Sequence, residues 1–320
     1  MLRSFLIHLS KANWARSMVT NWGFAWKAAS RFVAGETLGD AIQTIRVLNE
    51  RGITATLDHL GEHTTDTVKA KQAVQDILKA LDQIQATGVY ANVSIKLTQI
   101  GLALSEELCV ENLKQILTHA RDRDNFVRLD MEDSSCVDYT LRIYYRMREE
   151  YDLSNIGVVI QSYLYRSQND VTRIIQEGGR IRLCKGAYQE PPQVAFPIKK
   201  DVDTNYDFLA KIMIEGTLQL GSPLRSDNCL VPPIPAFATH DLKRILFVKE
   251  YASKLDLPKQ AIEFQMLYGI RRDLQDQIAR EGYPIRIYVP YGTEWYPYYV
   301  RRLAERPANV WFFISNFFKG

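Results

Sequence analysis

The chain has 320 residues, of which 46% are apolar and 24% are charged, and its 40 Lys and Arg nearly balance its 37 Asp and Glu. This composition is that of an ordinary globular protein and excludes a disordered chain, a collagen-like fibre and a small disulfide scaffold. A net charge of +3 is too small to favour nucleic acid as a partner, so no nucleic acid is expected.

The N-terminal sequence MLRSFLIHLSKANWARSMV lacks the uninterrupted apolar region of a signal peptide, and no run of 18 apolar residues occurs. Four widely spaced cysteines without a CxxC pair argue against a zinc site or a disulfide framework and fit a reducing compartment. We therefore expect a cytoplasmic protein, or one that is peripheral on the inner face of the cell membrane.

Residues 1–50 are predicted to form a helical arm, because apolar residues recur at helical spacing, as in Ile42, Ile45 and Leu48. From residue 51 onward, short β-rich runs alternate with longer amphipathic stretches. Eight strands are predicted, at residues 53–60, 90–97, 126–132, 156–163, 180–186, 234–240, 261–267 and 285–291. Successive strands are separated by about the length that one helix and two loops need.

The predicted strands are apolar almost throughout, as expected when both faces of a parallel sheet are covered. This pattern predicts an α/β fold of the (βα)8 TIM-barrel type over residues 51–320, ending in an aromatic-rich segment. The alternative is an open doubly wound sheet that binds a dinucleotide. That fold would need GxGxxG after its first strand, where this chain has GEHTT (61–65).

Polar residues recur in the predicted strands, mostly toward the end where barrel enzymes carry out their chemistry. They are Asp58, His59, Lys96, Asp130, Glu132, Gln161, Arg182, Lys185, Thr239, His240, Asp241, Glu263, Gln265, Tyr288 and Tyr291. A buried polar group without a partner is costly, so their recurrence favours a shared polar cavity. Structural ion pairs within the barrel are the alternative.

Lys96 and Asp130 lie on consecutive predicted strands and could form an ion pair. Such a pair could be structural or could belong to a functional site. His59 and His63 are four residues apart, which raises the possibility of a metal site. The chain has no HxH motif, and Thr and Gln dominate the other strand ends, so a metallohydrolase is the weaker interpretation.

The last unit, residues 294–306, is predicted as the eighth barrel helix. Tyr298, Arg301 and Glu305 share one face of it, and Arg302 is adjacent. Two guanidinium groups and a tyrosine at a barrel mouth could clamp a carboxylate or a phosphate. From spacing alone, a solvated arginine pair on an outer helix is the favoured alternative.

Motifs in chain order then resemble the proline dehydrogenase family. They are SIKL (94–97), LDME (129–132), IQSY (160–163), RLCKGAY (182–188), ATHD (238–241), EFQML (263–267) and YYVRRLAE (298–305). Family members are flavin-dependent (βα)8 barrels that also occur as one domain of bifunctional proline utilisation proteins. The family's bifunctional type carries Trp after KGAY, whereas this chain has Gln189.

The resemblance implies oxidation of L-proline to Δ1-pyrroline-5-carboxylate by hydride transfer to FAD, with electrons passed to a membrane quinone. It also implies a pyrroline-5-carboxylate dehydrogenase as the partner that receives the product. The residues it implies at the substrate are Lys96, Asp130, Leu267, Tyr288, Tyr298, Arg301, Arg302 and Glu305. Those it implies at FAD are Gln161, Arg182, Lys185, Gly186, Ala187, Lys199 in a long loop, Thr239, His240 and Gln265.

Two other functions stay open at this point. One is another barrel enzyme that binds an anion through the arginine pair, such as an aldolase that forms a Schiff base on Lys96. The other is a peripheral membrane scaffold built on the N-terminal helices. The terminal aromatics Trp311, Phe312, Phe313, Phe317 and Phe318 are expected to serve packing or to face a membrane rather than to take part in catalysis.

Overall fold

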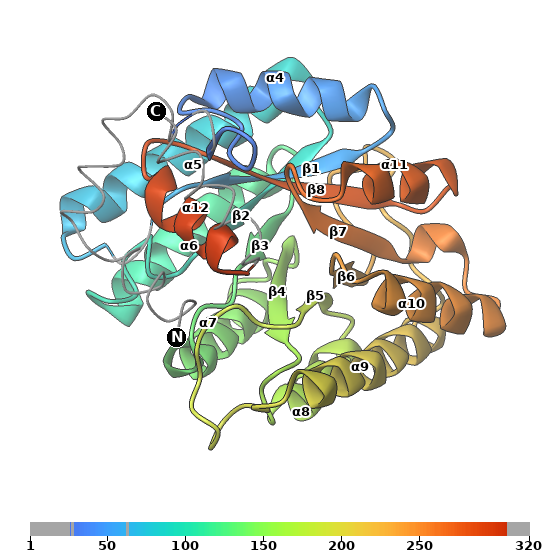
Figure 1. Cartoon of the computed structure of the whole chain (residues 1–320). Helices are drawn as coiled ribbons and strands as arrows, with labels where there is room; N and C mark the ends of the chain where they lie inside the picture. The colour runs from blue at the N-terminus through green and yellow to red at the C-terminus, as the bar shows by residue number, and fades with distance from the viewer. Residues whose placement is uncertain (1–25, 27–28, 62–63, 306–320) are drawn as a thin grey trace, which may run out of the picture.

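The fold is a closed barrel of eight parallel strands in chain order, surrounded by helices (Figure 1). The computed structural model describes residues 26, 29–61 and 64–305. The strands are β1 (Thr54–His59), β2 (Ala91–Ile95), β3 (Val127–Leu129), β4 (Ile156–Gln161), β5 (Arg180–Cys184), β6 (Pro235–Ala238), β7 (Glu263–Leu267) and β8 (Ile285–Tyr291). The predicted (βα)8 barrel is therefore confirmed, with each strand at its expected place.

The α-helices alternate with the strands. They are α4 (Leu38–Asn49), α5 (Thr67–Thr87), α6 (Glu106–Arg121), α7 (Val137–Glu149), α8 (Ser167–Gln176), α9 (Lys199–Gln219), α10 (Leu242–Lys254), α11 (Arg272–Arg280) and α12 (Trp295–Glu305). Two 3₁₀ turns, η1 (Ser134–Cys136) and η2 (Lys259–Ala261), complete the described elements.

Local sequence explains where these helices begin and end. The side chain of Asp66 accepts a hydrogen bond from the Lys69 backbone N–H and caps the beginning of α5. Gly88 ends the same helix in the left-handed conformation, with φ 65°. Thr37 and Asp40 form a reciprocal capping box at the beginning of α4.

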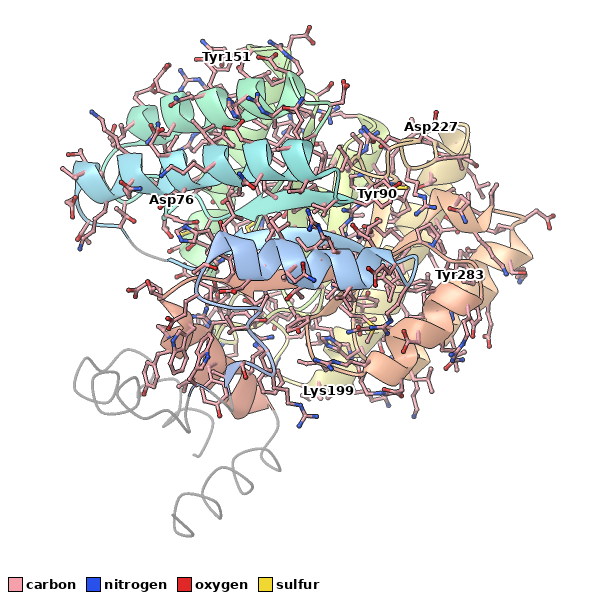
Figure 2. The ribbon with its side chains drawn as sticks, turned by 90° about the horizontal axis from the view of Figure 1, so that it is seen from above. Asp76, Tyr90, Tyr151, Lys199, Asp227 and Tyr283 are labelled. Atoms are coloured by element: carbon pink, nitrogen blue, oxygen red, sulfur yellow. The ribbon has the colours of Figure 1, made fainter. Side chains whose placement is uncertain are left out.

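The longest excursion of the barrel, between β5 and β6, differs from its prediction. Helix α9 begins at Lys199, whereas the sequence predicted a loop as far as residue 208. Lys199 therefore lies in the first turn of a helix and not in a loop. Figure 2 shows Lys199 and Asp227, which lies in the loop after α9, on different sides of the molecule.

Burial follows the architecture. Every residue of β2 and β4 is buried, because one face of each strand packs inside the barrel and the other packs under helices. Helix α4 packs against β1 and β8. The division of the chain into an arm (1–50) and a barrel (51–320) stays a prediction, and residues 306–320, with the terminal aromatics, lie outside the described part.

Candidate active site

A cavity of about 540 Å³ lies at the carboxyl ends of the barrel strands and is bordered by α12. Parallel strands in a closed barrel bring these ends to one rim, which explains why residues distant in sequence meet there. The lining includes the predicted substrate residues Lys96, Asp130, Leu267, Tyr288, Tyr298, Arg301 and Arg302. It also includes the predicted cofactor residues Gln161, Arg182, Lys185, Gly186, Ala187, Lys199, Thr239, His240 and Gln265.

Asp130 is the centre of a polar network on the floor of this cavity. One carboxylate oxygen accepts hydrogen bonds from Arg182 at 2.8 Å and from Ser94 at 2.5 Å, and the other accepts one from the Tyr288 hydroxyl at 2.6 Å. Lys96 Nζ lies 3.6 Å from the same carboxylate. The predicted pairing of Lys96 with Asp130 is therefore present.

Asp58 is the second acidic residue of the network, and Lys96 lies 3.3 Å from its carboxylate. Burial raises the pKa of Asp58, and Lys96 only partly opposes this effect. Burial also acts to raise the pKa of Asp130, but Lys96 and Arg182 outweigh it and hold that pKa below its usual value. The pKa values of the two carboxyl groups are therefore shifted in opposite directions, although both groups face Lys96.

The network continues into the barrel through Gln265. Its side-chain carbonyl accepts a hydrogen bond from Arg182, and its amide donates to Glu263 at 2.6 Å. Glu263 in turn pairs with Arg286 at 3.1 Å, and both are 1% exposed. Glu263, which the sequence grouped with the cavity residues, begins β7 and forms a structural ion pair below the cavity.

Helix α12 presents the arginine pair to the cavity. Arg301 and Arg302 are half-buried, and the Arg302 guanidinium lies 5.1 Å from the centre of the Tyr298 ring. The structure therefore differs from the solvated outer pair that spacing alone favoured. Glu305 is the last residue of α12, its side chain lies outside the described part, and its role stays a prediction.

On the side predicted for the cofactor, the loop after β5 packs closely against Tyr163 and forms ion pairs with two aspartates. Gly186 has φ 114°, and a Cβ there would lie 2.5 Å from the Tyr163 ring, so only glycine fits without a shift. Lys185 is held between Asp203 at 2.5 Å and Asp241 at 2.7 Å. Lys199 also pairs with Asp203, while its side chain is 74% exposed.

Two polar side chains on this side fit a flavin with many acceptors and donors. The buried side-chain oxygen of Gln161 has no hydrogen-bond partner in the structure, although its amide lies 3.2 Å from the Glu132 carbonyl. An orphaned buried acceptor at a cavity is satisfied when a ligand supplies a donor. His240 accepts a hydrogen bond from the Leu267 backbone N–H through Nε2 at 3.0 Å.

Several lining residues were missed. Asp58 was recognised as a polar strand end but received no role, and Met131, Cys184, Tyr188 and Met266 stand inside the motifs quoted above but were assigned no role. Asp58 could have been found from its place at the end of a buried strand, and the other four from the motifs that contain them. Burial raises the pKa of the Cys184 thiol to about 12, so this cysteine is not a ready nucleophile at neutral pH.

The metal interpretation finds no support in residues 26, 29–61 and 64–305, which hold no group of His, Cys, Asp or Glu suited to a metal ion. His59 packs its ring against Tyr291, with centres 5.1 Å apart. His63 lies outside the described residues. In the same part of the chain, no helix is long and apolar enough to span a bilayer.

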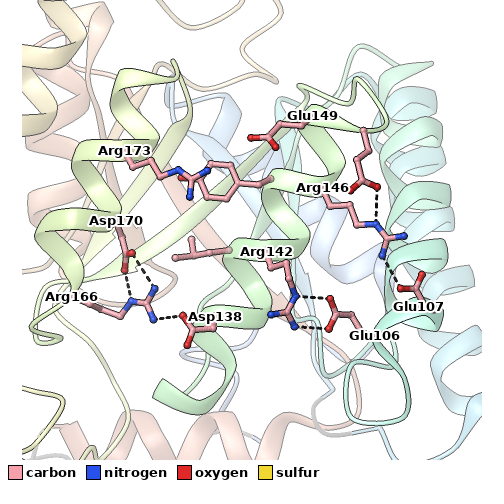
Figure 3. A pocket seen from close by; sticks show the side chains of 12 residues that line it. Glu106, Glu107, Asp138, Arg142, Arg146, Glu149, Arg166, Asp170 and Arg173 are labelled. Carbon is pink, nitrogen blue, oxygen red and sulfur yellow. Dashed lines mark hydrogen bonds and ion pairs between the residues drawn. The ribbon is translucent and has the colours of Figure 1, made fainter.

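A second cavity, of about 870 Å³, lies outside the barrel over α6, α7 and α8 (Figure 3). Its arginines bind neighbouring acids: Arg142 pairs with Glu106 at 2.6 Å, and Arg166 pairs with Asp138 at 2.5 Å and with Asp170 at 2.7 Å. These ion pairs join adjacent helices at the surface, where such pairs contribute little. The barrel cavity is therefore the better candidate for catalysis.

Comparison with known proteins identifies the family to which this fold corresponds. Residues 41–314 match the family model described as proline dehydrogenase. The chain is 40% identical to proline dehydrogenase 1 of Bacillus subtilis (strain 168), over the full length of both. It is also 40% identical to a proline dehydrogenase of Deinococcus radiodurans, over 92% of this chain and 91% of that one.

A solved structure is similar as well. It is that of proline utilization A from Bdellovibrio bacteriovorus inactivated by N-propargylglycine, with a TM-score of 0.78 and 27% identity. The match covers 90% of this chain and 33% of the other, so this chain corresponds to about a third of that protein.

Proposed function

The chain belongs to the proline dehydrogenase family, and from this premise we propose that it oxidises L-proline to Δ1-pyrroline-5-carboxylate with FAD as cofactor. The observation that carries the proposal is the placement of Arg301 and Arg302 on the same cavity as the Asp130 network. Proline offers one carboxylate, one amine and an apolar ring, and the cavity offers groups for each.

We assign the proline carboxylate to Arg301 and Arg302. Both arginines line the cavity from α12, whereas Lys96 and Arg182 near the floor face Asp58 and Asp130. A planar guanidinium binds a carboxylate through two hydrogen bonds, which fixes the orientation of the substrate as well as its position. Tyr298, Tyr288 and Leu267 supply the walls for the ring.

The amine of proline must be neutral for the neighbouring carbon to give up a hydride. Two guanidinium groups beside the substrate disfavour its ammonium form and so lower the pKa of the amine. The Tyr288 hydroxyl stays protonated, because burial and the adjacent Asp130 raise its pKa well above the usual value. Tyr288 therefore acts as a wall and a hydrogen-bond donor to Asp130, not as a base.

FAD, when bound, supplies the hydride acceptor that the protein's own side chains lack. Gln161, Arg182, Lys185, Gly186, Ala187, Lys199, Thr239, His240 and Gln265 are the residues that would hold it. The unsatisfied Gln161 oxygen at the cavity supports this assignment. Asp130 and Gln265 fix the Arg182 guanidinium from two sides.

We further propose a membrane quinone as electron acceptor and a pyrroline-5-carboxylate dehydrogenase as the partner that takes the product. The reactive imine product favours such a partner, and the family includes bifunctional proteins. We place the protein in the cytoplasm, peripheral on the inner face of the membrane, because a lipid-soluble acceptor requires access to the bilayer.

The Schiff-base aldolase is the second candidate, because Lys96 lies in the cavity. Its ammonium is flanked by Asp58 and Asp130 at 3.3 and 3.6 Å. These contacts suit an ion-pair partner better than the neutral amine that attacks a carbonyl.

One experiment separates the two functions. The purified protein is heated and the released cofactor identified, and turnover is followed with L-proline and a soluble quinone. We expect about one FAD per chain and proline-dependent quinone reduction. Absence of flavin, together with borohydride trapping of a carbonyl compound on Lys96, would establish the aldolase instead.

A further inference from the structure

We propose that residues 29–36, here called the strap, position α12 so that its arginine pair faces the cavity, and that Glu36 is a positioning residue acting through Trp295. This inference rests on the proposed function, since it assigns the strap a role in proline binding. The strap precedes α4 and lies far in sequence from the helix that it contacts.

The strap is tied to the chain just before α12. The Ala34 backbone N–H donates to the Pro290 carbonyl at 2.9 Å, and the Gly292 N–H donates to the Gly35 carbonyl at 3.0 Å. Gly292 lies three residues before the first residue of α12. These bonds therefore fix the point from which the helix departs.

The strap also passes against the loop after β7. Gly269 has φ 76°, and a Cβ there would overlap the Arg31 carbonyl oxygen. Gly269 lies two residues beyond Leu267, which lines the cavity. The strap thus touches the exits of two neighbouring strands that carry predicted substrate residues.

An apolar cluster separate from the barrel core joins the strap to α12. Phe32 and Val33 are buried in it, and the Phe32 ring centre lies 6.3 Å from that of Tyr299. Trp26, just before the strap, packs its ring 5.5 Å from that of Trp295. This packing holds one face of α12, with Trp295 and Tyr299 one turn apart.

The neighbouring part of the helix surface carries the site. Tyr298, Arg301 and Arg302 line the cavity. At 100° per residue, these three positions centre about 90° away from Trp295 and Tyr299, and Arg302 lies on nearly the same face as Trp295, two turns further along the helix. A small rotation of α12 about its axis would therefore move the arginines relative to the cavity floor.

Glu36 supplies the polar contact that fixes this rotation. The Trp295 indole N–H donates to Glu36 Oε1 at 3.1 Å, and Trp295 is 2% exposed. A buried indole N–H that loses its acceptor is costly, so α12 would shift to find another partner or water. Hydrophobic packing alone has no comparable directionality.

The test uses the full-length flavoprotein with three variants. Glu36→Ala removes the acceptor, Glu36→Gln keeps an acceptor oxygen, and Trp295→Phe keeps a ring but removes the N–H. Glu50→Ala is the control, because Glu50 is an exposed acid just after the last residue of α4, at the other end of that helix from Glu36. Proline KM, kcat and hydrogen exchange of a peptide over 295–302 are measured.

We expect Glu36→Ala and Trp295→Phe to raise KM roughly 3- to 10-fold with kcat within about twofold, the size of effect that a residue has when it acts on a site through another element. Hydrogen exchange over 295–302 should be faster in both of these variants and should stay at the wild-type rate in Glu36→Gln and Glu50→Ala. Unchanged exchange and KM in both disruptive variants would overturn the proposal, as would an equal effect of Glu36→Gln. If the wild type does not oxidise proline, the proposed function fails, while the exchange data alone still decide the role of the strap.

Discussion

At the scale of single residues, the arginine pair carries the central chemical claim. Arg301→Met removes one guanidinium from the cavity and leaves the network around Asp130 intact. We expect proline KM to rise by roughly 100-fold, the cost of losing one charge-assisted contact to a carboxylate, while FAD stays bound. Steady-state kinetics with a flavin count measures both, with Arg272→Met, on the exposed beginning of α11, as control. Loss of flavin from Arg301→Met would show that the arginine has been misassigned.

The two buried aspartates give a second prediction, on stability. The folded pKa of Asp130 is lowered, so its carboxylate stabilises the fold above the usual pKa near 4, and this contribution is lost as pH falls through the folded pKa. Asp58 has a raised pKa, so its charge costs stability as pH rises through that value. At pH 7, Asp130→Asn should therefore destabilise by about 2 kcal/mol and more than Asp58→Asn.

Urea unfolding at pH 7 and below pH 4 checks this. The difference between wild type and Asp130→Asn should begin to shrink below pH 4 and shrink further as pH falls through the lowered folded pKa of Asp130, where the wild-type carboxyl group also becomes neutral. An equal effect of the two substitutions at pH 7 would contradict the opposite pKa directions.

The substrate amine gives a third prediction. An alkylamine has a pKa of about 10, and the neutral form is the one that reacts, so the rate should rise with pH through the mildly alkaline range. The profile of kcat/KM for proline between pH 6 and 9 measures this. A flat profile would mean that amine deprotonation does not limit the reaction.

Residue roles could be predicted from sequence only in part. The strand ends and the motifs brought Lys96, Arg182 and Gln265 into one predicted site, because parallel strands in a barrel share one rim. Asp58 received no role, since nothing in the sequence shows that it shares Lys96 with Asp130. The place of Glu263 below the cavity depends on which way its side chain points from β7.

At the scale of elements, the loop after β5 is a strained feature with a matched control. Gly186→Ala introduces a Cβ into the Tyr163 ring at a left-handed φ of 114°, whereas Gly178→Ala, at φ 68°, meets no atom within 4 Å. Both substitutions strain the backbone, but only the first adds a clash. We expect Gly186→Ala to cost about 1–3 kcal/mol more and to weaken FAD retention.

Thermal unfolding and the flavin content after gel filtration measure the two effects. If Gly178→Ala lowers stability and flavin content as much as Gly186→Ala, then the close approach to Tyr163 has no specific importance.

Strands and helices were predicted correctly where the apolar pattern is strong, and their ends were predicted wrongly where it is weak. All eight strands lie within a few residues of their expected positions, because both of their faces are buried. The beginning of α9 was missed, since the segment 199–208 consists mostly of charged and polar residues and therefore resembles a loop. Its helical form depends on Tyr206, which is buried, and on Lys185, which pairs with Asp203.

At the scale of the whole molecule, the closed barrel forms the rim of the cavity, and α12 adds Tyr298, Arg301 and Arg302 to its lining. The floor of the cavity is fixed by the ion pair of Asp130, which follows β3, with Arg182 of β5, and below it Glu263 and Arg286 join the neighbouring strands β7 and β8. Helix α12 makes fewer contacts with the other described elements and depends on the strap instead. The contact between Glu36 and Trp295 could not be predicted from a local sequence pattern, because it joins segments about 260 residues apart.

The most direct test of the account is an anaerobic titration of the purified protein with L-proline, followed by flavin absorbance. If this chain oxidises proline through FAD, the flavin band bleaches in proportion to added proline, and one equivalent of Δ1-pyrroline-5-carboxylate appears per flavin reduced. A protein without flavin, or a flavin band that proline leaves unchanged, would contradict the account.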